Sequence, residues 1–86
     1  MRSRYHKNFQ RQLFKLPVAQ QKRARQAVSL FEVDPRNPTL RNHRLGGEWY
    51  GYHSISAGGD LRLHYKLLDE QMVLFVAVGS HSQLYG

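Results

Sequence analysis

Apolar residues near the start of the chain recur at the spacing of an α-helix. Phe9, Leu13 and Leu16 fall three or four positions apart, so the pattern predicts a short amphipathic helix over residues 7–15. Pro17 should end this helix, because the residue before a proline avoids the helical region of backbone space. Proline also fits the first turn of a helix, so a second helix is expected to follow at once.

The second predicted helix covers about residues 18–33. One stripe of it is apolar and consists of Ala24, Ala27, Val28 and Phe31. Lysine, arginine and glutamine side chains occupy the other side, as in a helix that covers a core with one face. Two prolines in segment 34–38 prevent the helix from continuing. The two helices are therefore expected to form a hairpin.

Further along the chain the pattern changes to the period of two that marks strands. Residues 49–56 are expected to form a strand, and the glycine-containing segment 57–60 a turn. In 61–68 apolar residues alternate with mostly polar ones, which predicts a half-buried strand. Residues 72–78 are apolar on both faces, so this strand is expected to be the most buried.

Two short elements complete the expected order. Residues 2–6 favour an edge strand, and Ser80 can cap a last helical turn over 80–84. The resulting order, β-α-α-β-β-β, predicts an α+β fold in which an antiparallel sheet carries the helical hairpin packed on one face. At this length, residues 1–86 are expected to be a single domain.

The charge of the chain is one-sided. With 13 Lys and Arg against 6 Asp and Glu the formal charge is +7, and residues 1–31 contain no acidic residue at all. Such a surface attracts polyanions through counterion release and steering, so a nucleic acid or an acidic protein is the expected partner. No apolar run of about 18 residues occurs, and no apolar stretch follows the basic N-terminus. We therefore expect no membrane partner and a cytoplasmic location.

Histidine is the residue that most suggests chemistry, because it titrates near neutral pH without help. Five are present: His6, His43, His53, His64 and His81. Their spacing contains no His-x-x-x-His pair, and the chain has no cysteine, so no metal site is expected. No G-x-S-x-G motif of a nucleophilic hydrolase occurs either. The expected chemistry needs neither a metal nor a small-molecule cofactor.

Several polar residues are expected at one edge of the sheet. Asp60, Arg62 and His64 share a face of one predicted strand by the period of two. His81 follows the end of the next strand, which should return to the edge where Asp60 begins. His43 joins them only if the loop after it folds back. Because a cation beside a carboxylate and an imidazole suits a phosphate group, this set favours phosphate chemistry.

Three segments of the chain carry a resemblance to a known family. Residues 42–52 resemble the pattern D-H-x-L-x-G-x-W-x-G-Y, and residues 59–66 resemble x-D-W-x-L-x-Y-K. Residues 79–86 resemble G-[ST]-H-x-x-L-F-G. In this order and spacing, the three segments are similar to those of YafQ-like toxins of the RelE/ParE superfamily, and the resemblance covers essentially the whole chain.

The resemblance implies the toxin of a type II toxin–antitoxin pair. Such a toxin is an mRNA endoribonuclease that cuts on the translating 70S ribosome and is silenced by a cognate antitoxin protein. By position, His43, Asp60 and His81 match residues taken as catalytic in the family, and Tyr85 stands where the family has a functional Phe. The chain departs from the family at Ser56, where a further histidine is expected, and at Leu61, where an aromatic residue is expected.

These matches lead to a hypothesis for the reaction, an attack of the ribose 2′-OH on the adjacent phosphate. His81 is the expected general acid and either His43 or Asp60 the general base. Arg62 would stabilise the charged phosphorane, and Tyr85 completes the predicted catalytic set. Contacts to the RNA are expected from a further group of mostly basic side chains: Lys7, Arg11, Lys15, Lys22, Arg41, Arg44, His64 and Lys66.

Two alternatives remain open on the sequence. One is a gyrase-poisoning toxin of the ParE type, which binds protein and cleaves no RNA. A binder needs no pair of imidazoles, so His43 and His81 count against it. The other is an inactive relative that only binds its antitoxin, and the departures at Ser56 and Leu61 favour this reading slightly.

Overall fold

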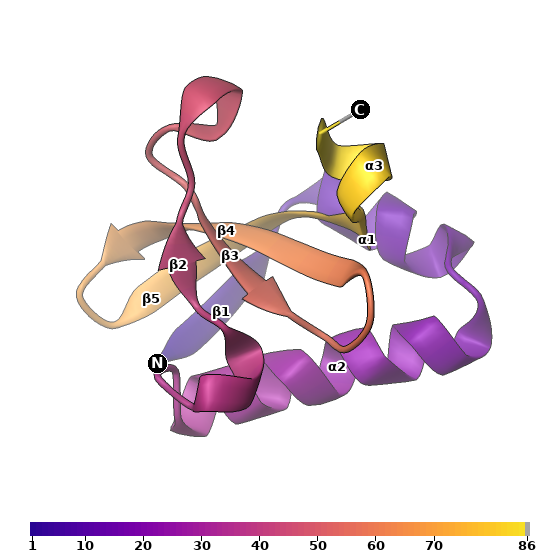
Figure 1. Ribbon diagram of the computed structural model, residues 1–86. Helices are drawn as coiled ribbons and strands as arrows, with labels where there is room; N and C mark the ends of the chain where they lie inside the picture. Colours follow the sequence, from indigo (N-terminus) through magenta and orange to yellow (C-terminus); the bar gives the residue numbers. More distant parts are fainter. Residues whose placement is uncertain (86) are drawn as a thin grey trace.

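A computed structural model describes residues 1–85 of the protein (Figure 1). Gly86, the last residue of the segment 79–86 that resembles the toxin family, lies outside the described residues. The helices and strands follow one another in the order β1 (Arg2–Tyr5), α1 (Lys7–Lys15), α2 (Val18–Val33), β2 (His43–Arg44), β3 (His53–Ser56), β4 (Leu61–Asp69), β5 (Met72–Ser80) and α3 (His81–Tyr85). Two short 3₁₀ turns lie between them, η1 (Pro38–Leu40) and η2 (Gly47–Trp49).

The five strands form one sheet in the order β1-β5-β4-β3-β2. The pairs β3–β4 and β4–β5 are antiparallel, as the sequence predicted. The two-residue strand β2, which was not expected from the sequence, is antiparallel to β3, whereas β1 lies parallel to β5. The sheet is therefore mixed, and the expectation of a purely antiparallel sheet was wrong for β1. The reason is topological: α1 and α2 separate β1 from the other strands, and a long crossover of this kind is what a parallel pair requires.

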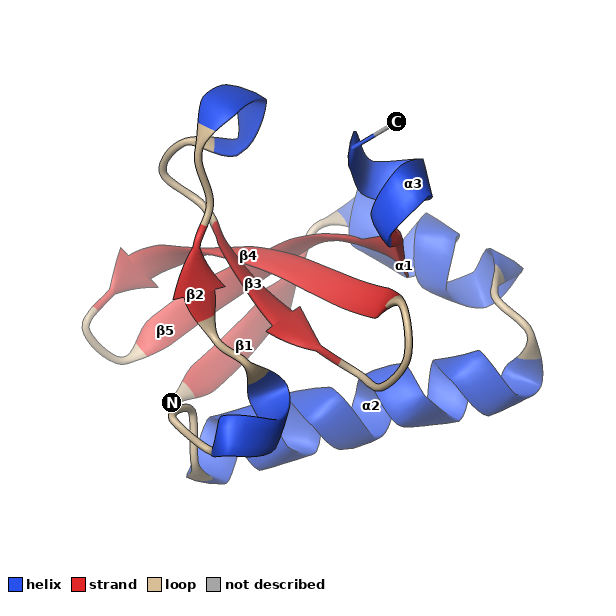
Figure 2. Ribbon diagram, viewed as in Figure 1, coloured by secondary structure: helices blue, strands red, loops and turns tan. Residues whose placement is uncertain are grey.

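The helices α1 and α2 pack on one face of the sheet, with α2 running beneath it (Figure 2). Aromatic rings fill the space between the layers. The Phe31 ring centroid on α2 lies 4.9 Å from that of Tyr65 and 5.6 Å from that of Phe75, and the Phe9 ring on α1 lies 5.7 Å from Phe75. These four side chains are buried, so the apolar stripes predicted for the two helices meet the inner face of β4 and β5. The α+β class is confirmed.

The helix α1 also covers part of an open sheet edge. β1 pairs with only the first half of β5. Beyond that point Gln12 on α1 accepts a hydrogen bond from the backbone N–H of Val78, with 2.9 Å between Oε1 and N. A strand N–H that would otherwise lack a partner is satisfied in this way.

The predicted helix bounds agree with the structure, but one predicted strand does not. Residues 49–56 were expected to be a strand, yet the strand begins only at His53 and the residues before it form η2 and a turn. Gly47 and Gly51 have φ angles of 59° and 92°, a left-handed region that glycine adopts easily. The aromatic residues of this segment therefore stand on a loop above the sheet.

Two register shifts interrupt the pairing of β4 with β5. At the first, the partners change from His64–Ala77 to Tyr65–Phe75, so the extra residue lies on β5 and the alternation of β4 is kept. His64 and Tyr65 are both buried, on opposite faces of the sheet. The second shift lies between Leu67 and Asp69, and Leu67, which the alternation placed inside, is exposed. Among the helices of residues 1–85, none is long and apolar enough to cross a membrane.

Candidate functional site

A row of polar residues crosses the sheet on the face turned away from α2. His43 on β2 lies opposite Ser54 on β3, Ser54 lies opposite His64 on β4, and His64 lies opposite Ala77 on β5. Directly opposed residues of antiparallel strands share a face, with Cβ atoms about 4.5–5.5 Å apart. The loop around η2 and the helix α3 both rise above this face (Figure 1). His43 was expected to join the other residues only if the loop after it folded back. The antiparallel pairing of β2 with β3 provides this return of the chain.

The ring of His43 is held in one orientation by its own backbone. Its Nδ1 lies 2.7 Å from the carbonyl oxygen of Arg41. A carbonyl can only accept, so Nδ1 carries the hydrogen and Nε2 of the neutral ring keeps a free lone pair. Arg41 has a left-handed φ of 49°, and the next side chain, Asn42, accepts from the Tyr65 hydroxyl and donates to the Pro35 carbonyl. His43 as a whole residue is exposed.

His64 lies beneath the site and is fully buried, with an exposed fraction of 0%. Its Nε2 is 3.1 Å from the hydroxyl of Tyr85, and the Trp49 ring stands edge-on to it at 4.3 Å between centroids. Burial, together with the nearby charges of His43 and His81, lowers the pKa of His64 from 6.5 to about 4. His64 was expected to contact RNA, and this expectation was wrong because the ring has no exposed atom in this structure.

The helix α3 begins with a reciprocal cap. The Ser80 hydroxyl accepts from the backbone N–H of Gln83, and the Gln83 side chain accepts from the N–H of Ser80. A Cβ at Gly79 would lie 2.8 Å from the Gln83 side-chain oxygen, so glycine leaves room for this cap. The first residue of the helix is His81, whose exposed ring lies 4.5 Å from that of Tyr85. Ser80 is thus the cap that the sequence predicted.

Arg62 is fixed on the same face, one row closer to the β3–β4 turn. It lies opposite Ser56 and Gly79. Its Nη1 donates to the Ser56 hydroxyl at 3.2 Å and to the Gly59 carbonyl at 2.9 Å. Burial raises the pKa of the Tyr85 hydroxyl, and the charge of Arg62 partly offsets this effect. The positive charge of Arg62 therefore acts on the Tyr85 hydroxyl.

Asp60 lies at the same sheet edge as His81, because the two residues flank the paired residues Leu61 and Ser80. This agrees with the edge predicted from the strand order. Asp60 is exposed in the turn that precedes β4. Among residues 1–85, no hydrogen bond joins its carboxylate to His43 or His81.

Trp49 is a site residue that the sequence did not reveal, since it was expected to pack in a strand. Its indole nitrogen donates to the Leu84 carbonyl at 3.2 Å, and its ring covers His64. An indole N–H that is partly buried needs an acceptor, but no sequence signal identifies that acceptor. Trp49 thus links the η2 loop to α3 above the row of polar residues that contains His43 and His64.

The predicted RNA-contacting side chains lie mostly on the surface. Six are exposed, Lys7, Arg11, Lys15, Lys22, Arg41 and Arg44. Lys66 is partly buried. Within residues 1–85, no three His, Asp or Glu side chains gather as a group that could hold a metal ion.

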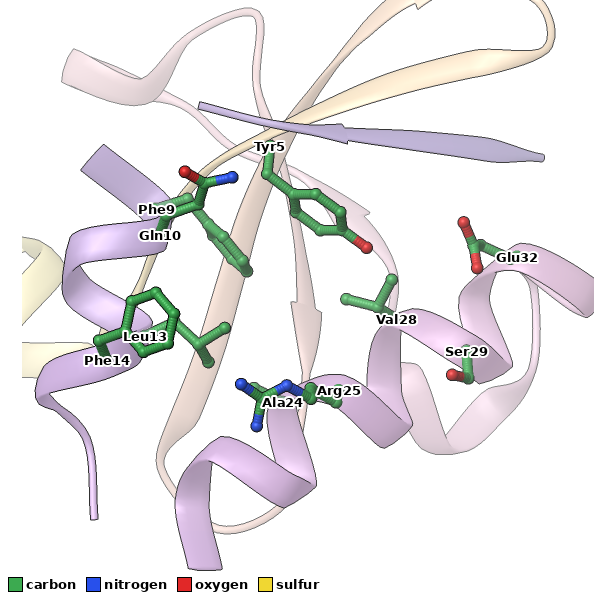
Figure 3. A pocket seen from close by; sticks show the side chains of 10 residues that line it. All are labelled: Tyr5, Phe9, Gln10, Leu13, Phe14, Ala24, Arg25, Val28, Ser29 and Glu32. Atoms are coloured by element: carbon green, nitrogen blue, oxygen red, sulfur yellow. The ribbon is translucent and has the colours of Figure 1, made fainter. Parts of the chain in front are cut away.

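A pocket of about 600 Å³ lies elsewhere, between the two long helices. Side chains of β1 and α1 face those of α2 across it (Figure 3). Most of its lining is apolar and includes Tyr5, Phe9, Phe14 and Val28. None of the histidines lines it, so the pocket is separate from the polar row on the other face of the sheet.

Comparisons with known proteins place this architecture in a family. The model of the family "Bacterial toxin of type II toxin-antitoxin system, YafQ" matches residues 1–86. The crystal structure of YafQ from E. coli strain BL21(DE3) superposes with a TM-score of 0.78 at 22% identity, over 100% of both chains. YafQ in the E. coli DinJ–YafQ complex gives 0.77 at 22% identity, again over 100% of both chains.

A chain of a second toxin–antitoxin complex superposes less closely. A chain of RelBE2 from Mycobacterium tuberculosis matches with a TM-score of 0.63 at 29% identity, covering 93% of this chain and 96% of that one. No curated protein matches the chain. The family model covers the whole sequence, and the fold is that of YafQ. The chain therefore belongs to the YafQ family of toxins of bacterial type II toxin–antitoxin systems.

Proposed function

We propose that this toxin is an endoribonuclease that cleaves mRNA on the translating ribosome. The ribose 2′-OH attacks the adjacent phosphate, and the chain supplies the proton transfers. The observation that carries the proposal is the convergence of four side chains above one face of the sheet: His43, Arg62, His81 and Tyr85. They surround the buried His64, whose pKa is lowered in part by the charges of His43 and His81. The RNA provides its own nucleophile, so the reaction needs no cofactor.

His43 is the general base in this mechanism, in preference to Asp60. Its Nδ1 hydrogen is committed to the Arg41 carbonyl, which leaves Nε2 as a proton acceptor toward the open face. Asp60 lies at the same sheet edge as His81. Within the described residues, however, no hydrogen bond orients its carboxylate toward His43 or His81. The orientation of His43 therefore supports it as the group that removes the 2′-OH proton.

His81 acts as the general acid on the leaving 5′-oxygen. It is exposed at the first position of α3, whose cap and contact with Tyr85 fix its backbone. Arg62 stabilises the phosphorane. All of its side-chain hydrogen bonds within residues 1–85 come from Nη1, so its other nitrogens remain available to phosphate oxygens.

The partners follow from the charge and from the relatives. The exposed basic residues of the N-terminal half suit ribosomal RNA and mRNA phosphates in the cytoplasm. Related toxins have been solved in complexes with DinJ and in RelBE2, and a cognate antitoxin is proposed to silence this chain in the same way.

The test is induced expression of the wild type and three variants, followed by primer extension on a reporter mRNA. His43→Asn and His81→Asn should each lower cleavage by about 10²- to 10⁴-fold. His6→Asn is the matched control: this exposed histidine caps α1 by accepting from Asn8, and asparagine is also a good cap.

Cuts in the wild type and His6→Asn that disappear in the other two variants would support the nuclease. If folded wild-type protein gave no cuts at all, the proposal would be wrong, and a ParE-type binder or an inactive relative would replace it. Induction of the DNA-damage response would indicate the first of these, and no effect on growth the second.

A further inference from the structure

His64 is a buried titratable residue that the proposed reaction does not use. Its ring is fully buried under the site. Its Nδ1 is buried and has no hydrogen-bond partner among residues 1–85. Its Nε2 has one, the hydroxyl of Tyr85, at 3.1 Å. A buried polar ring costs free energy unless its bonds are made, so this single bond is the contact through which His64 acts on its surroundings.

The partner of that bond belongs to the last helix, α3. This helix has only five residues, and so short a helix is not stable on its own in water. Two contacts hold its end over the sheet, the bond from Tyr85 to His64 and the bond from the Trp49 indole to the Leu84 carbonyl. Trp49 in turn packs edge-on against the His64 ring at 4.3 Å. His64 is therefore at the centre of both contacts.

The charge state of His64 matches this role. Burial and the charges of His43 and His81 lower its pKa to about 4, so the ring is neutral at neutral pH. A neutral ring can share a hydrogen with a phenol and does not repel a protonated His81, whereas a second imidazolium beneath the site would do so.

We propose that His64 is a positioning residue that, through Tyr85, fixes α3 and thereby sets the location of the His81 imidazole over the sheet. This inference rests on the proposed nuclease function for its catalytic consequence. The hydrogen bond occupies the Tyr85 hydroxyl, while the residue as a whole remains 41% exposed. His64 thus acts on the reaction without touching RNA.

Removing one partner of the bond should have a different effect from removing both. Tyr85→Phe leaves the buried His64 ring with no partner, and His64→Leu leaves the phenol facing an apolar side chain. The double variant H64L/Y85F contains neither polar group, and replacing both partners of a buried bond by apolar groups is often nearly neutral. The proposal therefore predicts non-additive effects.

The first measurement is single-turnover cleavage of a defined mRNA in a translating extract. Each single variant should lower the maximal rate by about 10- to 100-fold, the size expected for a misplaced catalytic group. The RNA concentration that gives half-maximal rate should change by less than about twofold, because His64 does not contact RNA. The double variant should be about 10-fold faster than either single variant.

The second measurement needs no activity, and it separates this inference from the proposed function. Histidine ring and backbone amide NMR signals of the full chain are compared among the same variants, with His53→Leu as control. His53 stacks on Tyr65 at 5.0 Å, on the other face of the sheet. The signals of His81 and α3 should shift in both single variants and return toward the wild-type positions in the double variant, and they should stay unchanged in the control.

The two measurements together distinguish a failure of this inference from a failure of the nuclease proposal. If the α3 and His81 signals of His64→Leu coincide with those of the wild type, or if the two substitutions combine additively in both measurements, His64 does not position α3 and the inference is overturned. If the wild type cleaves no RNA but the NMR cycle is non-additive, the nuclease proposal fails while the positioning of α3 by His64 is upheld.

Discussion

Acidification should destabilise this fold through His64. In the native protein the ring is buried and its pKa is lowered from 6.5 to about 4. In the unfolded chain it titrates near its ordinary value. As the pH falls below about 6.5, the unfolded state takes up a proton that the native state refuses, so the stability that this group contributes is complete above that pH and is lost progressively down to about pH 4. Burial together with the charges of Arg44 and His43 lowers the pKa of His53 also, and its contribution has the same sign.

The magnitude follows from the interval between the two pKa values. At about 1.4 kcal/mol for each pH unit, the fall from 6.5 to about 4 corresponds to a loss of at most roughly 3 kcal/mol. For a small domain with a total of about 5–15 kcal/mol, this is a large fraction of the stability.

The assay is urea unfolding at about pH 7 and about pH 4.5 for the wild type and two variants. His64→Leu removes the titrating group, so the difference between the two pH values should shrink by most of this amount, whatever the variant does to the stability at neutral pH. Val73→Ala, at another fully buried position, is the control, and it should lower stability at both pH values by the same amount, about 2 kcal/mol. An equal pH difference in the wild type and His64→Leu would refute the reasoning.

Three further predictions follow from the contacts in the structure. Phe75→Ala should cost about 3–5 kcal/mol in the free energy of urea unfolding, because its ring meets three other core rings; a cost below about 1 kcal/mol would mean that the core lies elsewhere. Gly79→Ala should fray the start of α3 and speed amide hydrogen exchange at Ser80, because the added Cβ displaces the Gln83 side chain that accepts from the Ser80 N–H; unchanged exchange would contradict this. Arg41→Gly and Arg41→Val both lose the side chain expected to contact RNA, but Arg41→Val should cleave about 10-fold or more slowly than Arg41→Gly, because glycine adopts the left-handed φ of this residue without strain. Equal rates for the two Arg41 variants in the primer-extension assay would show that the Arg41 backbone does not orient His43.

The helices of this fold could be predicted from local pattern because their limits are local. Pro17 separates α1 from α2, and the prolines of segment 34–38 end α2, so the expected ranges agree with the structure. The direction of β1 is different in kind. A four-residue strand of alternating pattern can pair in either direction, and its parallel pairing with β5 depends on how the whole helical hairpin crosses the sheet.

The loop before β3 was misjudged for a related reason. Trp49, Tyr50 and Tyr52 have the side chains that strands favour, so the pattern predicted a strand there. Two glycines with left-handed φ angles decide the outcome instead. The glycines were visible in the sequence, but their backbone conformation was not.

The candidate site was predictable in composition and only partly in arrangement. The period of two placed Arg62 and His64 on one face, and the structure agrees. The burial of His64 was not foreseeable, because it depends on Trp49 and Tyr85, which approach from the η2 loop and from α3. The proposed preference for His43 over Asp60 as base also rests on the structure, since the hydrogen bond that orients His43 is made by a backbone carbonyl two residues earlier.

The chemistry of the cut ends tests the proposed mechanism most directly. A translating extract is programmed with one defined mRNA, the purified toxin is added, and the ends of the fragments are analysed, with His81→Asn as the control. Attack by the 2′-OH predicts a 2′,3′-cyclic phosphate on the upstream fragment and a free 5′-hydroxyl on the downstream fragment, both absent with the control. Fragments that instead carried a 3′-hydroxyl and a 5′-phosphate would contradict histidine-driven transesterification.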